Sequence, residues 1–224
     1  RSTPKPSSAA SDVYKRQDQP SKGVLWGWEV SAYIWTKGIA AGTYAVAVLA
    51  MLGGMVEMSD HLWAMTLGVG ILFLALTGLL LVIDLDRPER FLYVILRPNW
   101  DSWLVKGAYI LSGYGGVLAL SMGVLILDLD RSLLSYLAIA GFPLALLTGV
   151  YTAWLLGQAK ARSWSEDSML PAKFLVETLV IGAEVFFPMA LLDPLSIPIG
   201  GVILVGTLVH DNRIVVKPQM EPLL

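Results

Sequence analysis

Residues 62–90 read LWAMTLGVGILFLALTGLLLVIDLDRPER, and this stretch decides the fold class. No charged side chain occurs from Leu62 to Ile83. An apolar run of about 20 residues is long enough to cross the hydrocarbon core of a bilayer as an α-helix. The charged segment DLDRPER follows at once, and its proline disfavours helical geometry at Arg87. The stretch therefore predicts a transmembrane helix that ends at a charged membrane boundary.

Similar apolar runs lie on both sides of this stretch. The 224-residue chain is 55% hydrophobic and 15% charged, whereas about a quarter of the residues of a soluble domain are charged. We therefore expect an all-α fold, a polytopic transmembrane bundle of about six helices over residues 33–56, 62–83, 104–127, 133–156, 174–192 and 197–209. The last is short and rich in glycine, so it would be marginal alone in lipid and is expected to be a hairpin arm or a shielded element.

The first seventeen residues do not fit this pattern. The segment Ser7–Gln17, SSAASDVYKRQ, resembles the in-frame translation of a sequencing-library adapter. It is polar and lacks the apolar core of a signal peptide. We expect residues 1–17 to be a non-native or disordered tail and residues 18–224 to form the transmembrane domain.

Gly38 and Gly42 are spaced as a small-residue motif within the first predicted helix. Such spacing lets the backbones of two helices approach closely in a membrane. We expect close packing at this point rather than a functional site.

Positive charge is distributed unevenly between the two sides of the predicted bundle. If the helices alternate in direction, one side carries Lys22, Arg87, Arg90, Arg97, Lys106, Lys160, Arg162, Lys173, Arg213 and Lys217, and the other side carries only Arg131. Lysine and arginine accumulate on the cytoplasmic side of membrane proteins. We expect both ends of the chain and the DRPER segment to lie in the cytoplasm.

Composition excludes several kinds of site. The chain has no cysteine, which excludes disulfides and thiolate ligation of zinc or an iron–sulfur cluster within it. Its two histidines, His61 and His210, lie at ends of predicted helices, so we expect neither a bis-histidine haem nor a metal site. A net charge of −2 gives no indication of nucleic-acid binding.

The charged group Asp84, Arg87 and Arg90 stands at the end of the second predicted helix. One interpretation is an interfacial salt-bridge cluster that ends the helix and fixes the shape of the loop. The other is a pocket that holds a polar head group, because the guanidinium fork binds oxygen acceptors in a fixed geometry. A carboxylate beside such a pocket can exchange protons.

Lys37 lies about one turn inside the first apolar stretch. A lysine in a membrane span is costly, so its side chain should face protein or water, or extend to the interface. Tyr33 precedes it by one turn, and Glu29 lies two turns back on the same face. Lys37 therefore either reaches the interface or pairs with Glu29 or an acid of another helix.

Glu177 and Glu184 lie seven positions apart, and so on one face of the fifth predicted helix. Two acids in one span are expensive unless they line an interior path. They are candidates for a proton path, or for partners of Lys37 or of arginines.

Three segments in order resemble a known family: WGWEVSAYIWTKGIAAG, DLDRPERFLYVILRPNWDSWLVKGAYIL and WLLGQAKARSWSEDSMLPAKFLVETL, covering about residues 24–180. The chain resembles the NrfD/PsrC family of integral membrane subunits of polysulfide-reductase-type respiratory complexes. Most members of that family have eight or more helices, whereas about six are predicted here. The most specific part of the resemblance is DLDRPERF followed by RPNWDSW.

The resemblance implies a bacterial or archaeal inner-membrane subunit that holds no redox centre of its own. It implies binding of menaquinone or another quinone at one membrane face. It also implies electron exchange with an iron–sulfur subunit, and through it with a catalytic subunit of molybdopterin or multihaem type. Carried onto this sequence, Asp84 and Glu29 would be the proton acceptors. The quinone-binding residues would be Tyr33, Lys37, Arg87 and Arg90.

Two other classes of protein remain open from the sequence. One is a small transporter or ion-conducting subunit, in which Lys37, Glu177 and Glu184 would be pathway residues. The other is a membrane anchor without a bound ligand. Quinone that co-purifies with the protein would separate the first interpretation from both.

Overall fold

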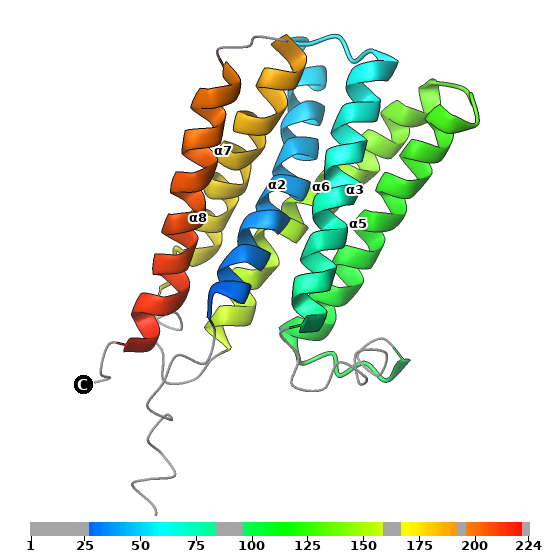
Figure 1. Cartoon of the computed structure of the whole chain (residues 1–224). Helices are drawn as coiled ribbons and strands as arrows, with labels where there is room; N and C mark the ends of the chain where they lie inside the picture. Colours follow the sequence, from blue (N-terminus) through cyan, green and yellow to red (C-terminus); the bar gives the residue numbers. More distant parts are fainter. Residues whose placement is uncertain (1–26, 84–95, 159–166, 192–195, 221–224) are drawn as a thin grey trace, which may run out of the picture.

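The computed structural model describes residues 27–83, 96–158, 167–191 and 196–220. These residues form helices α2 (Trp28–Leu52), α3 (Asp60–Ile83), α5 (Trp103–Ile126), α6 (Ser132–Gly157), α7 (Leu170–Leu191) and α8 (Ser196–Met220), and no strand occurs among them. The helices lie side by side and successive helices run in opposite directions (Figure 1). The prediction of an all-α, multi-pass helical bundle is confirmed.

Helix α2 is the central helix of the bundle. It packs against α3, α6, α7 and α8, and 83% of its most apolar stretch is buried, compared with 22–39% for the other candidate spans. The outer helices present their apolar side chains to the surroundings, as a lipid-facing surface requires. Side chains on α2 are therefore surrounded by protein, which makes it the helix best placed to carry buried polar groups.

Five of the six described helices are long and apolar enough to cross a membrane, and α8 is not among them. The structure extends this helix to Met220, well past the predicted end at residue 209. Its polar second half is held by the bundle, because Asp211 and Val215 are fully buried and Asn212 accepts a hydrogen bond from Ser31 of α2 at 3.2 Å. Helix α8 is therefore held in the bundle by its contacts with α2 and α7, although it is not apolar enough to be a candidate membrane span.

The two ends of the bundle differ in their connections. We call one the Ile83 end, where α3, α6 and α8 finish and α2, α5 and α7 begin, and the other the Arg131 end (Figure 1). This alternation is the one on which the count of positive charges was based. The segment that contains Asp84, Arg87 and Arg90 follows directly on the Ile83 end, but lies outside the described residues.

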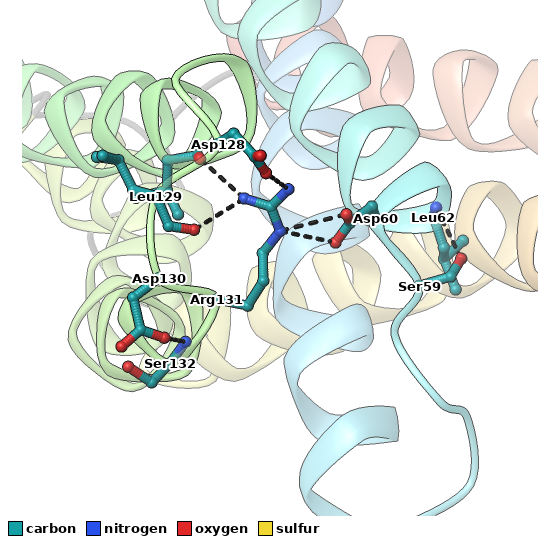
Figure 2. A network of polar contacts seen from close by, with 9 residues as sticks. Ser59, Asp60, Leu62, Asp128, Leu129, Asp130, Arg131 and Ser132 are labelled. Carbon is teal, nitrogen blue, oxygen red and sulfur yellow. Dashed lines mark hydrogen bonds and ion pairs between the residues drawn. The ribbon is translucent and has the colours of Figure 1, made fainter.

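At the Arg131 end, one guanidinium joins two turns of the protein (Figure 2). Arg131 donates to both carboxylate oxygens of Asp60 at 3.1 and 3.2 Å and to Asp128 at 2.8 Å. It also donates to the backbone carbonyl oxygens of Val124 and Leu129. Asp128 has a positive φ of 51°, unusual for a residue with a side chain, and the bond to Arg131 helps to hold this conformation. The start of α3 is thereby tied to the α5–α6 connection.

Candidate functional site

Lys37 lies in the interior of the bundle and is 0% exposed. Its Nζ atom donates a hydrogen bond of 2.5 Å to Oγ1 of Thr152 on α6. Three aromatic rings surround the ammonium group, with Nζ 4.8 Å from the ring centroid of Tyr151, 5.5 Å from Tyr33 and 5.6 Å from Phe174. The negative faces of these rings stabilise a cation. The interior position predicted by one interpretation of Lys37 is therefore observed, and its side chain does not extend to the interface.

Tyr33 shares the same hydroxyl partner. Its phenolic oxygen lies 3.3 Å from Oγ1 of Thr152 in a buried contact. Tyr33 and Lys37, the two residues predicted to donate hydrogen bonds to a ligand, are thus brought together on one face of α2. No sequence pattern pointed to Thr152, because it is one of several residues of α6 that carry a hydroxyl group.

Two carboxyl groups from other helices complete the cluster. Glu177 of α7 and Asp211 of α8 both interact electrostatically with Lys37, and they interact with each other. Asp211 is 0% exposed. Among the described residues, no hydrogen-bond partner of good geometry meets either carboxylate oxygen of Asp211 or Oε1 of Glu177. Unpaired buried carboxylates are costly, so these oxygens are the part of the cluster with unmet hydrogen-bonding capacity.

We call Tyr33, Lys37, Thr152, Glu177 and Asp211 the buried polar layer; Glu177 is half-buried, and the other four side chains are buried. At 1.5 Å per residue, Lys37 lies roughly 13 Å along α2 from its first residue, and Asp211 lies roughly as far from the last residue of α8. Glu177 lies roughly 10 Å from the start of α7. The layer is therefore about a third of the way through the bundle, on the side of the Ile83 end.

The other predicted site residues lie elsewhere. Glu29 is half-buried in the first turn of α2, where the positive end of the helix dipole favours a carboxylate. Glu184 is half-buried and lies two turns deeper along α7 than Glu177. Asp84, Arg87 and Arg90 fall outside the described residues.

A cavity of about 370 Å³ opens near the Ile83 end, between the end of α6 and the start of α7. The rings of Trp103 and Trp154 stack at its wall with centroids 4.7 Å apart. Asp167 also lines it and accepts a hydrogen bond from Lys173 at 2.5 Å. This bond holds the pKa of Asp167 below its usual value. The Ile83 end, which the charged segment follows in sequence, therefore has a cavity lined by aromatic and polar side chains.

Asp211 is the main functional candidate that sequence reasoning missed. The predicted sixth helix ended before it because HDNR reads as the start of a polar tail. A signal was present, since Asp211, Ile214 and Val215 follow the spacing of one helical face. That spacing indicates that the helix continues and that the aspartate shares its buried face.

Metal ligation is not indicated by the described part of the protein. It contains no group of three or more histidine, cysteine, aspartate or glutamate residues that could hold a metal ion. His61 and His210 are both exposed, on α3 and α8. The candidate site is therefore a proton- and hydrogen-bonding site built from an amine, a phenol, a hydroxyl and two carboxyl groups.

Comparison with known proteins agrees with this membrane architecture. The protein is 27% identical over 184 residues to the C subunit of polysulfide reductase from Wolinella succinogenes, an alignment that covers 71% of this protein and 56% of the relative. It is 26% identical over 189 residues to protein NrfD of Escherichia coli, covering 73% and 59%. It thus spans somewhat more than half the length of these curated relatives. The sequence profile described as polysulphide reductase, NrfD, matches residues 17–193, and the protein therefore belongs to the NrfD family of multi-pass membrane proteins.

Proposed function

We propose that this protein is the membrane subunit of a respiratory oxidoreductase complex and that it handles a quinone, such as menaquinone, near the Ile83 end of the bundle. In this proposal electrons pass between the quinone and an iron–sulfur partner subunit, which serves a catalytic subunit of molybdopterin or multihaem type. The membrane subunit contributes the binding site and the proton transfers. The observation that carries the proposal is the buried polar layer, set in an apolar bundle of a family whose members include the C subunit of polysulfide reductase.

The chemistry of a quinone fits this layer. Its redox step moves two protons with two electrons, so a site needs hydrogen-bond donors at the ring oxygens and acceptors for protons. Lys37 and Tyr33 supply an ammonium and a phenol side by side, both within hydrogen-bond distance of Thr152. A quinone oxygen that replaced the Thr152 hydroxyl would meet both donors.

The residues at the Ile83 end would receive the quinone and its protons. Glu29 stands in the first turn of α2 and Asp84 follows the last residue of α3, so both belong to this end and would accept protons. Arg87 and Arg90 would anchor the polar head group, as arginine does for planar oxygen ligands. Glu177 and Glu184 would carry protons along α7.

The charge distribution supports a location for this site. The alternation of the helices assigns to the Ile83 end ten of the eleven lysines and arginines in the connections and helix ends after residue 17, five of them among the described residues. Positive residues favour the cytoplasmic side. We propose an inner-membrane protein of a bacterium or archaeon with both ends in the cytoplasm.

Substitution of the charged segment tests the proposal. We expect Asp84→Asn to lower quinol-dependent electron transfer at least about 100-fold, the lower limit for loss of a positioned proton-transfer group. Arg87→Gln should also lower it, because the polar head group loses an anchoring guanidinium. The measurement is the rate of electron transfer from a quinol to the iron–sulfur partner in membranes that contain the assembled complex. The matched control is Asp101→Asn, because Asp101 is an exposed carboxylate at the same end. Full activity in both variants, with the complex assembled, would contradict the assignment of these residues.

Ion conduction is the second candidate function. The observation that favours it is the presence of three ionisable groups, Lys37, Glu177 and Asp211, inside a bundle of membrane helices. Such groups mark ion and proton pathways. Purification from native membranes separates the two functions: bound quinone and a co-purifying iron–sulfur protein support the first, and their absence from an active ion-conducting preparation supports the second.

A further inference from the structure

The interior of the bundle holds an unequal number of positive and negative groups. Among the described residues, Lys37 is the one fully buried cation and Asp211 the one fully buried carboxylate. Glu177, which is half-buried, adds a second carboxyl group, whose Oε1 is buried. Among the described residues, one ammonium therefore stands against two carboxyl groups, and a second ionised carboxylate would have no described cation to compensate it.

The hydrogen bonds of the cluster also show that its carboxylate oxygens lack a described donor. The Lys37 ammonium donates to the neutral hydroxyl of Thr152, and none of the described side chains donates to either oxygen of Asp211 or to Oε1 of Glu177. The two carboxyl groups interact with each other, and the helices that carry them, α7 and α8, are in contact. A carboxylate only accepts hydrogen bonds, whereas a protonated carboxyl group also donates one. A proton on one of the two groups would therefore supply the missing donor and remove the excess charge together.

The packing of α8 holds Asp211 in this place. The neighbouring Asn212 accepts a hydrogen bond from Ser31. One turn further along α2, the Trp35 indole donates to the carbonyl oxygen of Leu204 at 2.9 Å. Both bonds join α2 to α8, on either side of Asp211 along the helix. The register of α8 against α2 is thus fixed, and Asp211 cannot turn towards solvent without breaking these contacts.

We propose that Asp211 and Glu177 form a proton-binding site in which two carboxyl groups share one exchangeable proton, with the Lys37 ammonium balancing the remaining charge. Two ionised carboxylates at short range repel each other, and one shared proton would remove this repulsion. Among the described residues, the titratable groups Tyr33 and Tyr151 also face the site, because their rings lie around Lys37. The site does not require a quinone, so its test can succeed or fail whether or not the protein has the function proposed above.

Charge balance predicts a different number of protonated carboxyl groups in each variant. In the wild type, one group is protonated. Asp211→Asn and Glu177→Gln each leave one carboxylate beside the Lys37 ammonium, so that no proton is needed. Lys37→Met removes the cation, so that both carboxyl groups should be protonated.

Infrared spectroscopy of the purified protein in lipid nanodiscs at neutral pH tests these numbers, because a protonated carboxyl group has a C=O band that an ionised one lacks. We expect Asp211→Asn and Glu177→Gln to remove the same component of this band, and Lys37→Met to raise it about twofold. Glu57→Gln is the matched control, since Glu57 is an exposed carboxylate in the α2–α3 connection and its loss should leave the band unchanged.

Two results would overturn the proposal. The first is a band that neither carboxyl substitution alters. The second is a band that is absent in sodium chloride and appears when choline replaces sodium, which would identify the shared ligand as a sodium ion. If Asp211→Asn fails to fold, as judged by its elution in detergent, Glu177→Gln and Lys37→Met carry the test with the same expected signs.

Discussion

The hydroxyl group of Thr152 is the contact on which the buried polar layer depends. It accepts a hydrogen bond from the Lys37 ammonium and lies within hydrogen-bond distance of the Tyr33 phenol. An amine without a hydrogen-bond partner in the interior of a protein would lose much of its solvation without compensation. One hydroxyl therefore sets the position of both donors to which a quinone oxygen would bind.

We expect Thr152→Val to destabilise the protein by about 1–3 kcal/mol, the cost of leaving a buried polar group without its partner. Valine keeps the shape of the side chain and removes only the hydroxyl. Thr152→Ser is the matched control, because serine retains the acceptor. Thermal unfolding in one detergent measures the effect, and a melting temperature of Thr152→Val equal to that of the serine variant would show that the hydroxyl is dispensable.

Part of this cluster could be predicted from the sequence. The interior position of Lys37 was one of two predicted alternatives, since an intramembrane lysine must be shielded unless it reaches the interface. Its partner could not be predicted, because Thr152 stands 115 positions away and hydroxyls occur throughout apolar helices. Only the packing of α2 against α6 decides which hydroxyl meets the ammonium.

Close contact between α2 and α7 is the main structural feature at the scale of the helices. A Cβ atom on Gly42 would come within 2.0 Å of the carbonyl oxygen of Thr178, and one on Gly182 within 2.1 Å of the backbone of Gly42. The two backbones therefore touch at Gly42, and a Cβ atom on Gly38 would lie 3.1 Å from the Ile181 side chain. The close packing predicted for this pair of glycines is confirmed. This contact places Lys37 of α2 beside Glu177 of α7.

Alanine at position 42 should separate the two helices. We expect Gly42→Ala to cost about 1–3 kcal/mol, as overpacking of a tight contact does, and to lower the melting temperature of the protein. Gly68→Ala is the control, because nothing lies within 4 Å of a Cβ atom at Gly68. The control should be unchanged or slightly stabilised, since alanine favours helices. Equal melting temperatures of the two variants would contradict the close contact.

The sequence predicted the helices unequally well. The first five begin and end within five residues of their predicted ranges, because long apolar runs bounded by charges leave little freedom in a membrane. The extent of α8 was missed, because its polar half reads as a tail until its contacts with α2 are known. The Gly42 contact could be predicted as tight, but its partner Gly182 could not.

At the scale of the whole molecule, the described helices place the start of α2 and the end of α8 at the same end of the bundle (Figure 1). Of the described lysines and arginines outside the bundle interior, Arg97, Lys106, Lys173, Arg213 and Lys217 lie towards this Ile83 end. Arg131 is the one described cation at the other end, where it pairs with Asp60 and Asp128. The contrast supports an orientation with the Ile83 end in the cytoplasm.

Single cysteines test this orientation directly, because the protein has no cysteine of its own. Asp101→Cys and Glu57→Cys place exposed thiols at the Ile83 end and the Arg131 end, respectively. In intact spheroplasts we expect a membrane-impermeant maleimide to label position 57 and not position 101, and in inverted vesicles the reverse. The opposite pattern would show that the Ile83 end faces outwards.

The weak hydropathy of α8 has a consequence for how the protein is made. A translocon inserts segments by their own apolarity, and α8 does not reach the level of the other five helices. Ser31 of α2 and its partner Asn212 of α8 are 181 positions apart. At a translation rate of about 5–20 residues per second, α8 is therefore synthesised roughly 10–40 s after α2. During that interval Lys37 lies in an incomplete bundle without Asp211. A membrane insertase or quality-control protease that recognises exposed charge would therefore be able to bind this protein before α8 docks.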